Sequence, residues 1–297
     1  MPKIAFLGAG STVFAKVILG DSMLKPALQD SHIALYDIDA ERLNDSKLMI
    51  ENLNANINEG RATITAHHGV ENRKKALGGA DYIVNAIQVG GYKPSTVIDF
   101  EIPKKYGLRQ TIADTLGIGG IFRAARTIPV MLDIARDIEA VCPNAWLLNY
   151  TNPMSMVTGG VLHGSSVKFV GLCHSVQVCA EHLLKNLGMW NDDLNLRWNI
   201  AGINHQAWLL DIRDAQKDLY PEIKARAAEK LRELRKRGGA KVEQEAKERL
   251  GDDWENDPDA RAAHDMVRLE IMNRFGYYHT ESSEHASEYM PWFIKSD

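Results

Sequence analysis

The chain has 297 residues, of which 45% are hydrophobic and 25% charged, and its formal net charge is −4. The length predicts one large domain or two ordinary ones, and the composition is typical of a soluble globular protein. The negative charge argues against a surface for nucleic acid or anionic membranes. No apolar run approaches the roughly 20 residues of a membrane-spanning helix, and the immediate entry into an apolar strand predicts no signal peptide.

Apolar runs and helical patterns alternate along the first 170 residues. Strands are predicted at residues 3–7, 32–39, 61–69, 80–88, 145–153 and 167–175. Helices are predicted at residues 13–24, 40–57 and 121–141. Strands alternating with helices of this length predict βαβ units and a parallel sheet. We therefore expect an α/β, Rossmann-like fold for this part of the chain.

The sequence changes in character after about residue 190. Residues 194–215 are predicted to form a hairpin or another antiparallel patch, and residues 220–250 have helical spacing with many Lys, Arg and Glu. That charged stretch is either a solvated helix face or a loosely ordered excursion, and residues 241–260 resemble an insertion. The shift predicts two domains: a nucleotide-binding domain at 1–170 and a metal- and substrate-binding α+β domain at 171–297.

The stretch "GAGST" follows the first predicted strand and precedes a helix. Gly8 permits a tight turn, and Gly10 lets the backbone approach a pyrophosphate at the helix N-terminus, with Ser11 and Thr12 completing the turn. Asp37 ends the second strand, where a carboxylate binds the adenosine ribose hydroxyls and disfavours a 2′-phosphate. These residues predict an NAD site; the alternative is a loop that is rich in glycine for packing alone.

Polar side chains end two further strands of the predicted sheet. Asn85 and Gln88 follow the fourth strand, where they either contact the cofactor or cap the next helix. Asn149 and Asn152 belong to "NYTNP" at the end of another strand. An Asn-Pro turn at that edge suits hydrogen bonding to a substrate hydroxyl or carbonyl, although such a dipeptide alone is often only a turn.

A cysteine and a histidine from separate segments are candidate metal ligands. Cys173 lies at a strand end and His205 in "AGINHQAW". A thiolate and an imidazole can bind a divalent transition ion and leave positions open for substrate oxygens. Spacing alone leaves the alternatives open, because a strand-end cysteine is often a small buried hydrophobe. The three cysteines form no CxxC motif, which predicts a reducing cytoplasm.

These residues together resemble glycoside hydrolase family 4, in particular its α-galactosidase (melibiase) branch. The matching blocks run from the first residues to the last and read "GAGST", "ADTLGIGGIFRAARTIPV", "LNYTNPM", "GLCHSVQ", "GINHQAW" and "GYYHTESSEHASEYMPWF". Members of that family usually continue well beyond a "PWF" block. The resemblance therefore implies that the substrate domain is incomplete here by comparison with the family.

The resemblance implies an NAD- and metal-dependent glycosidase, outside the two-carboxylate scheme of most glycosidases. NAD takes hydride from sugar C3, which acidifies the proton on C2, and manganese or another divalent metal polarises the C2 and C3 oxygens. A base removes the C2 proton, the glycosidic oxygen leaves C1, water adds, and hydride returns to C3. A small-molecule sugar is the expected substrate, and a homo-oligomer is the expected assembly.

The family's functional residues carry over to particular positions. Cys173 and His205 match the metal ligands, and Asn152, with Asn149 beside it, matches the substrate-binding region. His174 matches the proton donor, and a neutral imidazole near pH 7 can relay that proton; alternatively, it orients the Cys173 thiolate. Further candidates are Tyr278 as the base, and Asp114 as a group that contacts the sugar or a metal-bound water, or that caps a helix.

The sequence is also compatible with other functions. An α-galacturonidase or α-glucosidase of the same family is the nearest alternative to an α-galactosidase. A lactate/malate-type NAD dehydrogenase shares the sheet topology and the Asn-Pro turn but does not need Cys173. An inactive NAD-binding remnant is a third alternative. A metal requirement for activity would distinguish a glycosidase of this family from the dehydrogenase and from the remnant.

Overall fold

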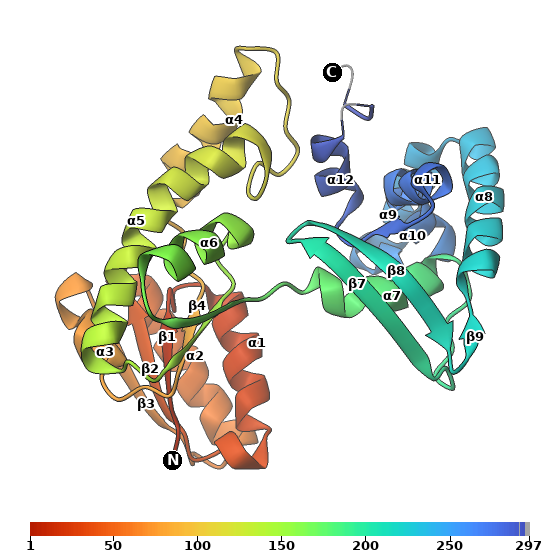
Figure 1. The fold of residues 1–297 in the computed structure, drawn as a ribbon. Helices are drawn as coiled ribbons and strands as arrows, with labels where there is room; N and C mark the ends of the chain where they lie inside the picture. Colours follow the sequence, from red (N-terminus) through yellow and green to blue (C-terminus); the bar gives the residue numbers. More distant parts are fainter. Residues whose placement is uncertain (291, 295–297) are drawn as a thin grey trace. The chain divides into compact units, whose positions relative to one another are not determined.

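The computed structural model describes residues 1–290 and 292–294 (Figure 1). The chain forms two compact units, the first from Met1–Ile102 with Ile118–Leu172, the second from Pro103–Gly117 with the chain from Cys173 onward. The second unit thus includes 103–117, which the predicted division placed in the first domain. In the described part of the chain, no helix combines the length and apolar character needed to cross a membrane.

The first unit is built on a six-stranded sheet whose neighbouring strands all pair in parallel. The strand order is β3-β2-β1-β4-β5-β6, with bounds β1 (Lys3–Leu7), β2 (His32–Asp37), β3 (Thr63–His68), β4 (Tyr82–Asn85), β5 (Trp146–Asn149) and β6 (Lys168–Gly171). Strand order reverses between β1 and β4, and this switch point is where Rossmann folds bind dinucleotides. The predicted Rossmann-like parallel sheet is confirmed.

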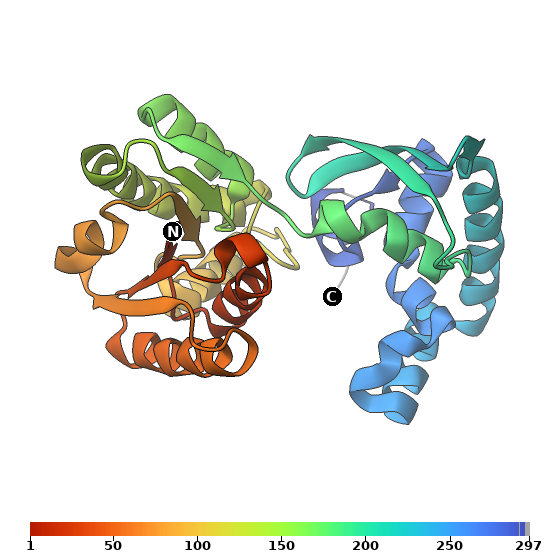
Figure 2. The same cartoon turned by 90° about the horizontal axis from the view of Figure 1, so that it is seen from below.

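Helices cover both faces of this sheet, as Figures 1 and 2 show. They are α1 (Thr12–Met23), α2 (Ala40–Ile57), α3 (Arg73–Leu77), α5 (Gly117–Val141) and α6 (Met154–Gly164). A further helix, α4 (Val97–Lys104), lies beyond the end of the sheet, and shorter helical segments lie at Pro26–Leu28, Val70–Asn72 and Gly91–Thr96. In β1, Phe6 packs into the core under α1 and α2, whereas Leu7 packs into the core under α3, α5 and α6. Burial on both faces explains the uninterrupted apolar strand sequences.

The second unit contains an antiparallel sheet in the order β10-β8-β7, with β9 paired to β8. The strands are β7 (Leu196–Ile203), β8 (Gln206–Asp214), β9 (Lys217–Asp218) and β10 (Tyr278–His279), and the first two form the predicted hairpin. The helices are α7 (Ser175–Asn186), α8 (Tyr220–Arg237), α9 (Gly239–Leu250), α10 (Pro258–His264), α11 (Met266–Phe275) and α12 (Ser283–Tyr289), with a short helical turn at Gly251–Asn256. Leu183, Leu209, Ile223 and Leu269 are among the residues of their shared core.

The charged stretch forms ordered helices rather than a loose excursion. Val242 and Ala246 of α9 are buried, and Val242 packs in one apolar cluster with Leu234 of α8 and Ala262 of α10. The charged side chains occupy the remaining faces, where Lys230 pairs with Asp259 at 2.8 Å. An apolar stripe at helical spacing therefore outweighs the high charge content of the segment.

Candidate functional site

The turn between β1 and α1 requires glycine at its first position. Gly8 has φ +81°, and a Cβ there would lie 2.8 Å from the carbonyl carbon of Ala86, which follows β4. The Gly8 and Ala9 N–H groups both donate to the Tyr36 carbonyl at 3.0 Å. The turn thus packs tightly between β2 and the end of β4, which leaves no room for a side chain at Gly8. The same is required of the first glycine in a dinucleotide-binding turn.

Gly10 and Asp37 meet at the sheet edge beside this turn. The Gly10 N–H donates to Asp37 Oδ2 at 2.6 Å, and a Cβ on Gly10 would lie 2.9 Å from the same oxygen. The Asp39 N–H holds Asp37 Oδ1 at 2.9 Å, so two backbone groups orient the carboxylate. Ser11 precedes α1, which begins at Thr12, and its side chain makes no capping hydrogen bond. The first turn of α1 has no acidic residue, so it keeps the electrostatic character that favours a phosphate.

The amides predicted to line the sheet edge differ in availability. Asn85 and Asn149 are both fully buried, and Asn85 Nδ2 donates to Asn149 Oδ1 at 2.7 Å. Asn149 Nδ2 in turn donates to the Thr151 carbonyl at 3.0 Å. This burial does not support direct ligand contacts by Asn85 or Asn149; they shape the strand ends. Gln88 is exposed and donates to Thr96 at 3.2 Å, and Asn152 is partly buried.

Cys173 and His174 lie directly after β6 and before α7. Cys173 is partly buried, and its Sγ lies 2.9 Å from Ser175 Oγ. His174 is exposed and is the residue that precedes the first turn of α7. The Cys173 thiol therefore points into the second unit, whereas the His174 imidazole is accessible. This arrangement is compatible with Cys173 as a metal ligand and His174 as a proton donor.

His205 lies in the turn between β7 and β8 and has a left-handed backbone conformation, with φ +60°. Such a conformation is uncommon for residues other than glycine, and it clusters at functional sites. Its side chain is 8% exposed. A hairpin turn thus delivers one buried imidazole to the interior of the second unit.

One hydroxyl determines how the His205 ring is protonated. Thr115 Oγ1 lies 2.7 Å from His205 Nδ1, and the same hydroxyl donates to Asp114 Oδ1 at 2.7 Å. Because a hydroxyl has a single hydrogen, Thr115 accepts from the His205 Nδ1–H. In the neutral ring, Nε2 then carries a lone pair rather than a hydrogen. The Asp114–Thr115 pair thereby prepares Nε2 as a ligand atom, as the outer groups of metal sites do.

His205 Nε2 faces a carboxylate and a thiol. Glu281 Oε2 lies 3.2 Å from Nε2 and 3.9 Å from Cys173 Sγ, and the ligand atoms of these three residues lie within 4.8 Å of one another. A lone pair directed at a carboxylate oxygen is repulsive unless a cation or a proton lies between them. The donor set of one thiolate, one imidazole and one carboxylate fits a divalent transition metal.

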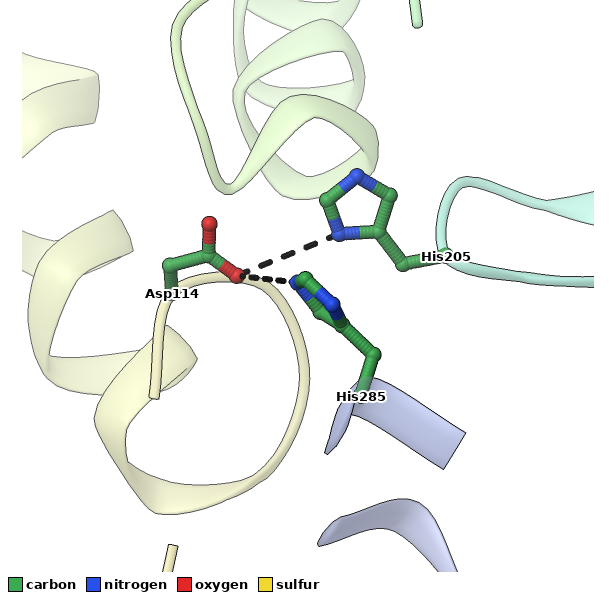
Figure 3. A group of neighbouring side chains, drawn as sticks. All are labelled: Asp114, His205 and His285. Carbon is green, nitrogen blue, oxygen red and sulfur yellow. Dashed lines mark ion pairs between the residues drawn. The ribbon is translucent and has the colours of Figure 1, made fainter. Parts of the chain in front are cut away.

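A second group lies on the other side of the His205 ring. Asp114, His205 and His285 have ligand atoms within 4.8 Å of one another (Figure 3). Asp114 Oδ1 lies 3.4 Å from His285 Nε2 and 3.9 Å from His205 Nδ1, and the two rings pack edge to face with centroids 4.5 Å apart. Because Thr115 occupies the hydrogen-bonding direction of Nδ1, this group orients His205 rather than competing for its free lone pair.

The neighbouring charges adjust the acidity of the cluster. Burial opposes ionisation of Asp114, but hydrogen bonding from His285 and Thr115 lowers its pKa to about 2. Burial likewise opposes charge on Cys173 and Glu281, yet interactions with His205 leave the pKa of both groups lowered. Lowered pKa values favour the anionic forms that bind metals.

The structure does not support Tyr278 as a base. Its side chain is fully buried in the core of the second unit, and its hydroxyl donates to Asp265 Oδ2 at 2.5 Å. Burial raises the pKa of Tyr278 well above the usual range. A phenol that is shielded from solvent and already paired with a carboxylate cannot accept a proton from a sugar. Tyr278 is therefore a structural residue of this core.

Four residues of this site were not singled out from the sequence: Thr115, Glu281, His285 and Glu288. Glu288 of α12 accepts the backbone N–H groups of residues 111–113, at 2.7 Å for both Thr111 and Ile112. It fixes the loop that carries Asp114 and Thr115. Glu281 precedes α12 and His285 lies in its first turn, so no regular helix spacing in the sequence marked these two residues as a pair.

The fold and the clustered side chains define a class of protein: a Rossmann-type chain whose second unit brings together a thiol, an imidazole and a carboxylate that could hold a metal ion. The family model for family 4 glycosyl hydrolases matches residues 3–189, and the model for the family's C-terminal domain matches residues 200–297. The chain belongs to glycosyl hydrolase family 4. This membership confirms the resemblance that the sequence motifs indicated.

Individual relatives agree with this assignment. The chain is 56% identical to the alpha-galactosidase of Bacillus subtilis (strain 168) over 295 residues, which cover 99% of this chain and 60% of that protein. Among solved structures, it is similar to lplD from Bacillus subtilis, with a TM-score of 0.76 and 27% identity over 98% of this chain and 63% of that one. A 6-phospho-alpha-glucosidase from gut microorganisms, solved with NAD and Mn²⁺, shares the fold with a TM-score of 0.73 and 20% identity over 99% of this chain and 61% of that one. The chain thus spans about three fifths of the length of these relatives.

Proposed function

We propose that the protein is an NAD- and divalent-metal-dependent glycoside hydrolase that acts on small α-galactosides. The observation that carries this proposal is the cluster of Cys173, His205 and Glu281, in which a prepared imidazole lone pair faces a carboxylate and a thiol. A dehydrogenase of the lactate/malate type has no use for such a donor set. The 56% identity to an alpha-galactosidase supports the choice of sugar.

The first unit supplies the nucleotide site in this proposal. NAD, when bound, would accept hydride from the sugar and return it. Gly8 and Gly10 bring the backbone and the N-terminus of α1 to the pyrophosphate, and Asp37 accepts hydrogen bonds from the ribose hydroxyls. The backbone N–H groups that hold Asp37 keep its carboxylate oriented before the ligand arrives. Gln88 and Asn152, which are not fully buried, remain candidates for contacts with the cofactor and the substrate.

The second unit supplies the metal site. A divalent metal such as Mn²⁺, when bound by Cys173 and His205, would act as a Lewis acid toward the sugar oxygens. Thr115 and Asp114 hold the His205 ring so that Nε2 presents its lone pair, and Ser175 orients the thiol. Asp114 acts in this account through His205.

His174 is the proposed proton donor to the departing glycosidic oxygen. It is exposed, directly follows Cys173 and carries an imidazole, a group suited to general acid catalysis. Its position beside the thiolate would bring a proton to the sugar that the metal holds. Replacement of His174 by Asn should then slow cleavage of substrates with poor leaving groups more than cleavage of nitrophenyl glycosides, because a good leaving group needs little protonation.

The proposal is tested by hydrolysis of nitrophenyl α-galactoside with NAD, Mn²⁺ and a thiol reductant, using D₂O as solvent. We expect cleavage that a chelator stops, and galactose that carries deuterium at C2. Product without deuterium at C2 would contradict elimination. Oxidation of a 2-hydroxy acid that survives the chelator would favour the dehydrogenase, and NAD binding without any cleavage would favour the remnant. The galacturonide and the α-glucoside, assayed in parallel, identify the sugar.

We also infer a reducing cytoplasmic location and a homo-oligomeric assembly. Cys142, Cys173 and Cys179 are all free thiols, and the metal-ligand role requires Cys173 to stay reduced. The assembly follows from the family resemblance, and light scattering coupled to size-exclusion chromatography measures it. Loss of Mn²⁺-dependent cleavage on mild oxidation, restored by a thiol reductant, would support the redox requirement.

A further inference from the structure

The metal site acquires a third donor from a segment far away in the sequence. Cys173 follows β6, His205 lies in the β7–β8 turn, and Glu281 lies between β10 and α12. Glu281 has a side chain that is 14% exposed, and its Oε1 accepts the Ser282 N–H at 3.0 Å. That hydrogen bond leaves Oε2 as the oxygen directed at His205 Nε2.

The distances between the donor atoms match those around a single ion. With metal bonds of about 2.3 Å to sulfur and about 2.1 Å to nitrogen and oxygen, tetrahedral edges are about 3.4 Å between N and O and about 3.6 Å between S and O. The corresponding separations are 3.2 Å from Nε2 to Oε2 and 3.9 Å from Sγ to Oε2. One ion can therefore contact all three side chains with only small adjustments.

We propose that Glu281 is the third protein ligand of this metal ion. This inference rests on the proposed function, since it concerns the same metal. A thiolate and a carboxylate together balance the two charges of the ion, and three protein donors still leave positions open for substrate oxygens. The consequence is that the protein holds its metal before the sugar binds, rather than depending on sugar oxygens to complete the site.

The test is titration of the full chain with Co²⁺ alone, without NAD or sugar, because Co²⁺ reports its ligands in its absorption. In the unsubstituted protein we expect tight binding with a thiolate-to-cobalt band that disappears in Cys173→Ser. Glu281→Gln should weaken Co²⁺ at least about tenfold and change the visible bands. Glu281→Asp keeps the charge but shortens the side chain, and it should weaken binding as well. Circular dichroism and urea unfolding of each variant verify that the second unit is folded.

Glu284→Gln is the matched control. It removes the same charge from the same segment, but Glu284 Oε1 lies 3.5 Å from His264 Nε2, outside the cluster. We expect its Co²⁺ dissociation constant to stay within about twofold, because a single partly exposed charge outside the cluster changes binding little in salt. If Glu281→Gln resembles this control, or if Glu281→Asp binds Co²⁺ as the unsubstituted protein does, the ligand assignment is overturned. Absence of a Cys173-dependent band in the unsubstituted protein would instead overturn the metal site on which the proposed function depends.

Discussion

The two units build their candidate sites from different parts of the chain. In the first unit, the backbone makes the site: a glycine turn, the N-terminus of a helix and one carboxylate held by Gly10 N–H. In the second unit, side chains make it, and they come from segments around residues 114, 173, 205 and 281. A backbone site tolerates few residue types at a few adjacent positions, whereas a side-chain site depends on how distant segments pack.

This difference predicts that substitutions in one unit leave the other unit's ligand unaffected. The largest effect should come from Cys173→Ser, which removes the thiolate and should lower metal-dependent cleavage by at least about 100-fold. NAD binding should stay unchanged, because the proposed NAD site lies in the first unit. Activity measured over a range of Mn²⁺ concentrations tests the loss of metal-dependent cleavage, and NAD titration by fluorescence tests whether NAD affinity is unchanged. Full turnover by the variant would show that the thiol is no ligand.

Gly8→Ala should have the converse effect. The added Cβ meets the Ala86 backbone at 2.8 Å in a conformation with φ +81°, so the turn must shift. We expect a loss of about 1–3 kcal/mol in the free energy of unfolding and severely weakened NAD binding. Urea unfolding measures the first and NAD titration the second. Co²⁺ binding should persist under conditions where the variant is folded, and its loss there would break the proposed independence.

Asp37→Ala should weaken NAD without disturbing the fold. A hydrogen bond to a charged group contributes about 1.5–3 kcal/mol, which corresponds to roughly a 10- to 150-fold change in the dissociation constant. Asp39→Ala is the comparison variant, since Asp39 caps α2 by accepting from Glu41 and Arg42. It should lower the free energy of unfolding by about 1 kcal/mol and leave NAD affinity intact. An unchanged NAD dissociation constant in Asp37→Ala would contradict the ribose contact.

Thr115→Val should give the smallest effect. It removes the hydroxyl that accepts from His205 Nδ1 while keeping the shape of the side chain, and we expect about tenfold weaker Co²⁺ binding. Thr111→Val is the control on the same loop, because Thr111 Oγ1 donates to the Glu284 carbonyl rather than to His205. Equal affinities for both variants, measured by Co²⁺ absorption, would show that the ring needs no such support.

The sequence predicted the first unit well because its signals are local. The alternation of apolar strands with helices predicts the parallel sheet. The motif "GAGST" between a strand and a helix is typical of the tight turn of a dinucleotide-binding fold. The position of Asp37 was predicted for the same reason: it ends the strand beside that turn. Asn149 was placed at the right edge, but the pattern could not reveal that its amide is buried against Asn85.

The second unit shows where such reasoning stops. The residue types made Cys173 and His205 candidates, and only the family resemblance matched them to metal ligands. Glu281 was passed over because nothing local distinguishes it from the other acidic residues near it. Tyr278 was chosen by motif position, yet two-residue strand β10 turns it into the core toward Asp265. Which side of a short strand faces the core depends on register with its partner, here Tyr278 opposite Leu209, and register is a tertiary property.

The loop of residues 103–117 bears on how the molecule can be divided. Although it lies between segments of the first unit in the chain, it belongs to the second, where Glu288 accepts three of its backbone N–H groups. A fragment that begins at Cys173 would keep every proposed ligand but lose Thr115, leaving the Nδ1 side of His205 open to water. A fragment that is cut before Cys173 would thus contain the proposed metal ligands, but nothing in it would fix the tautomer of the His205 ring. To express the second unit by itself, residues 103–117 would have to be joined to the segment that begins at Cys173.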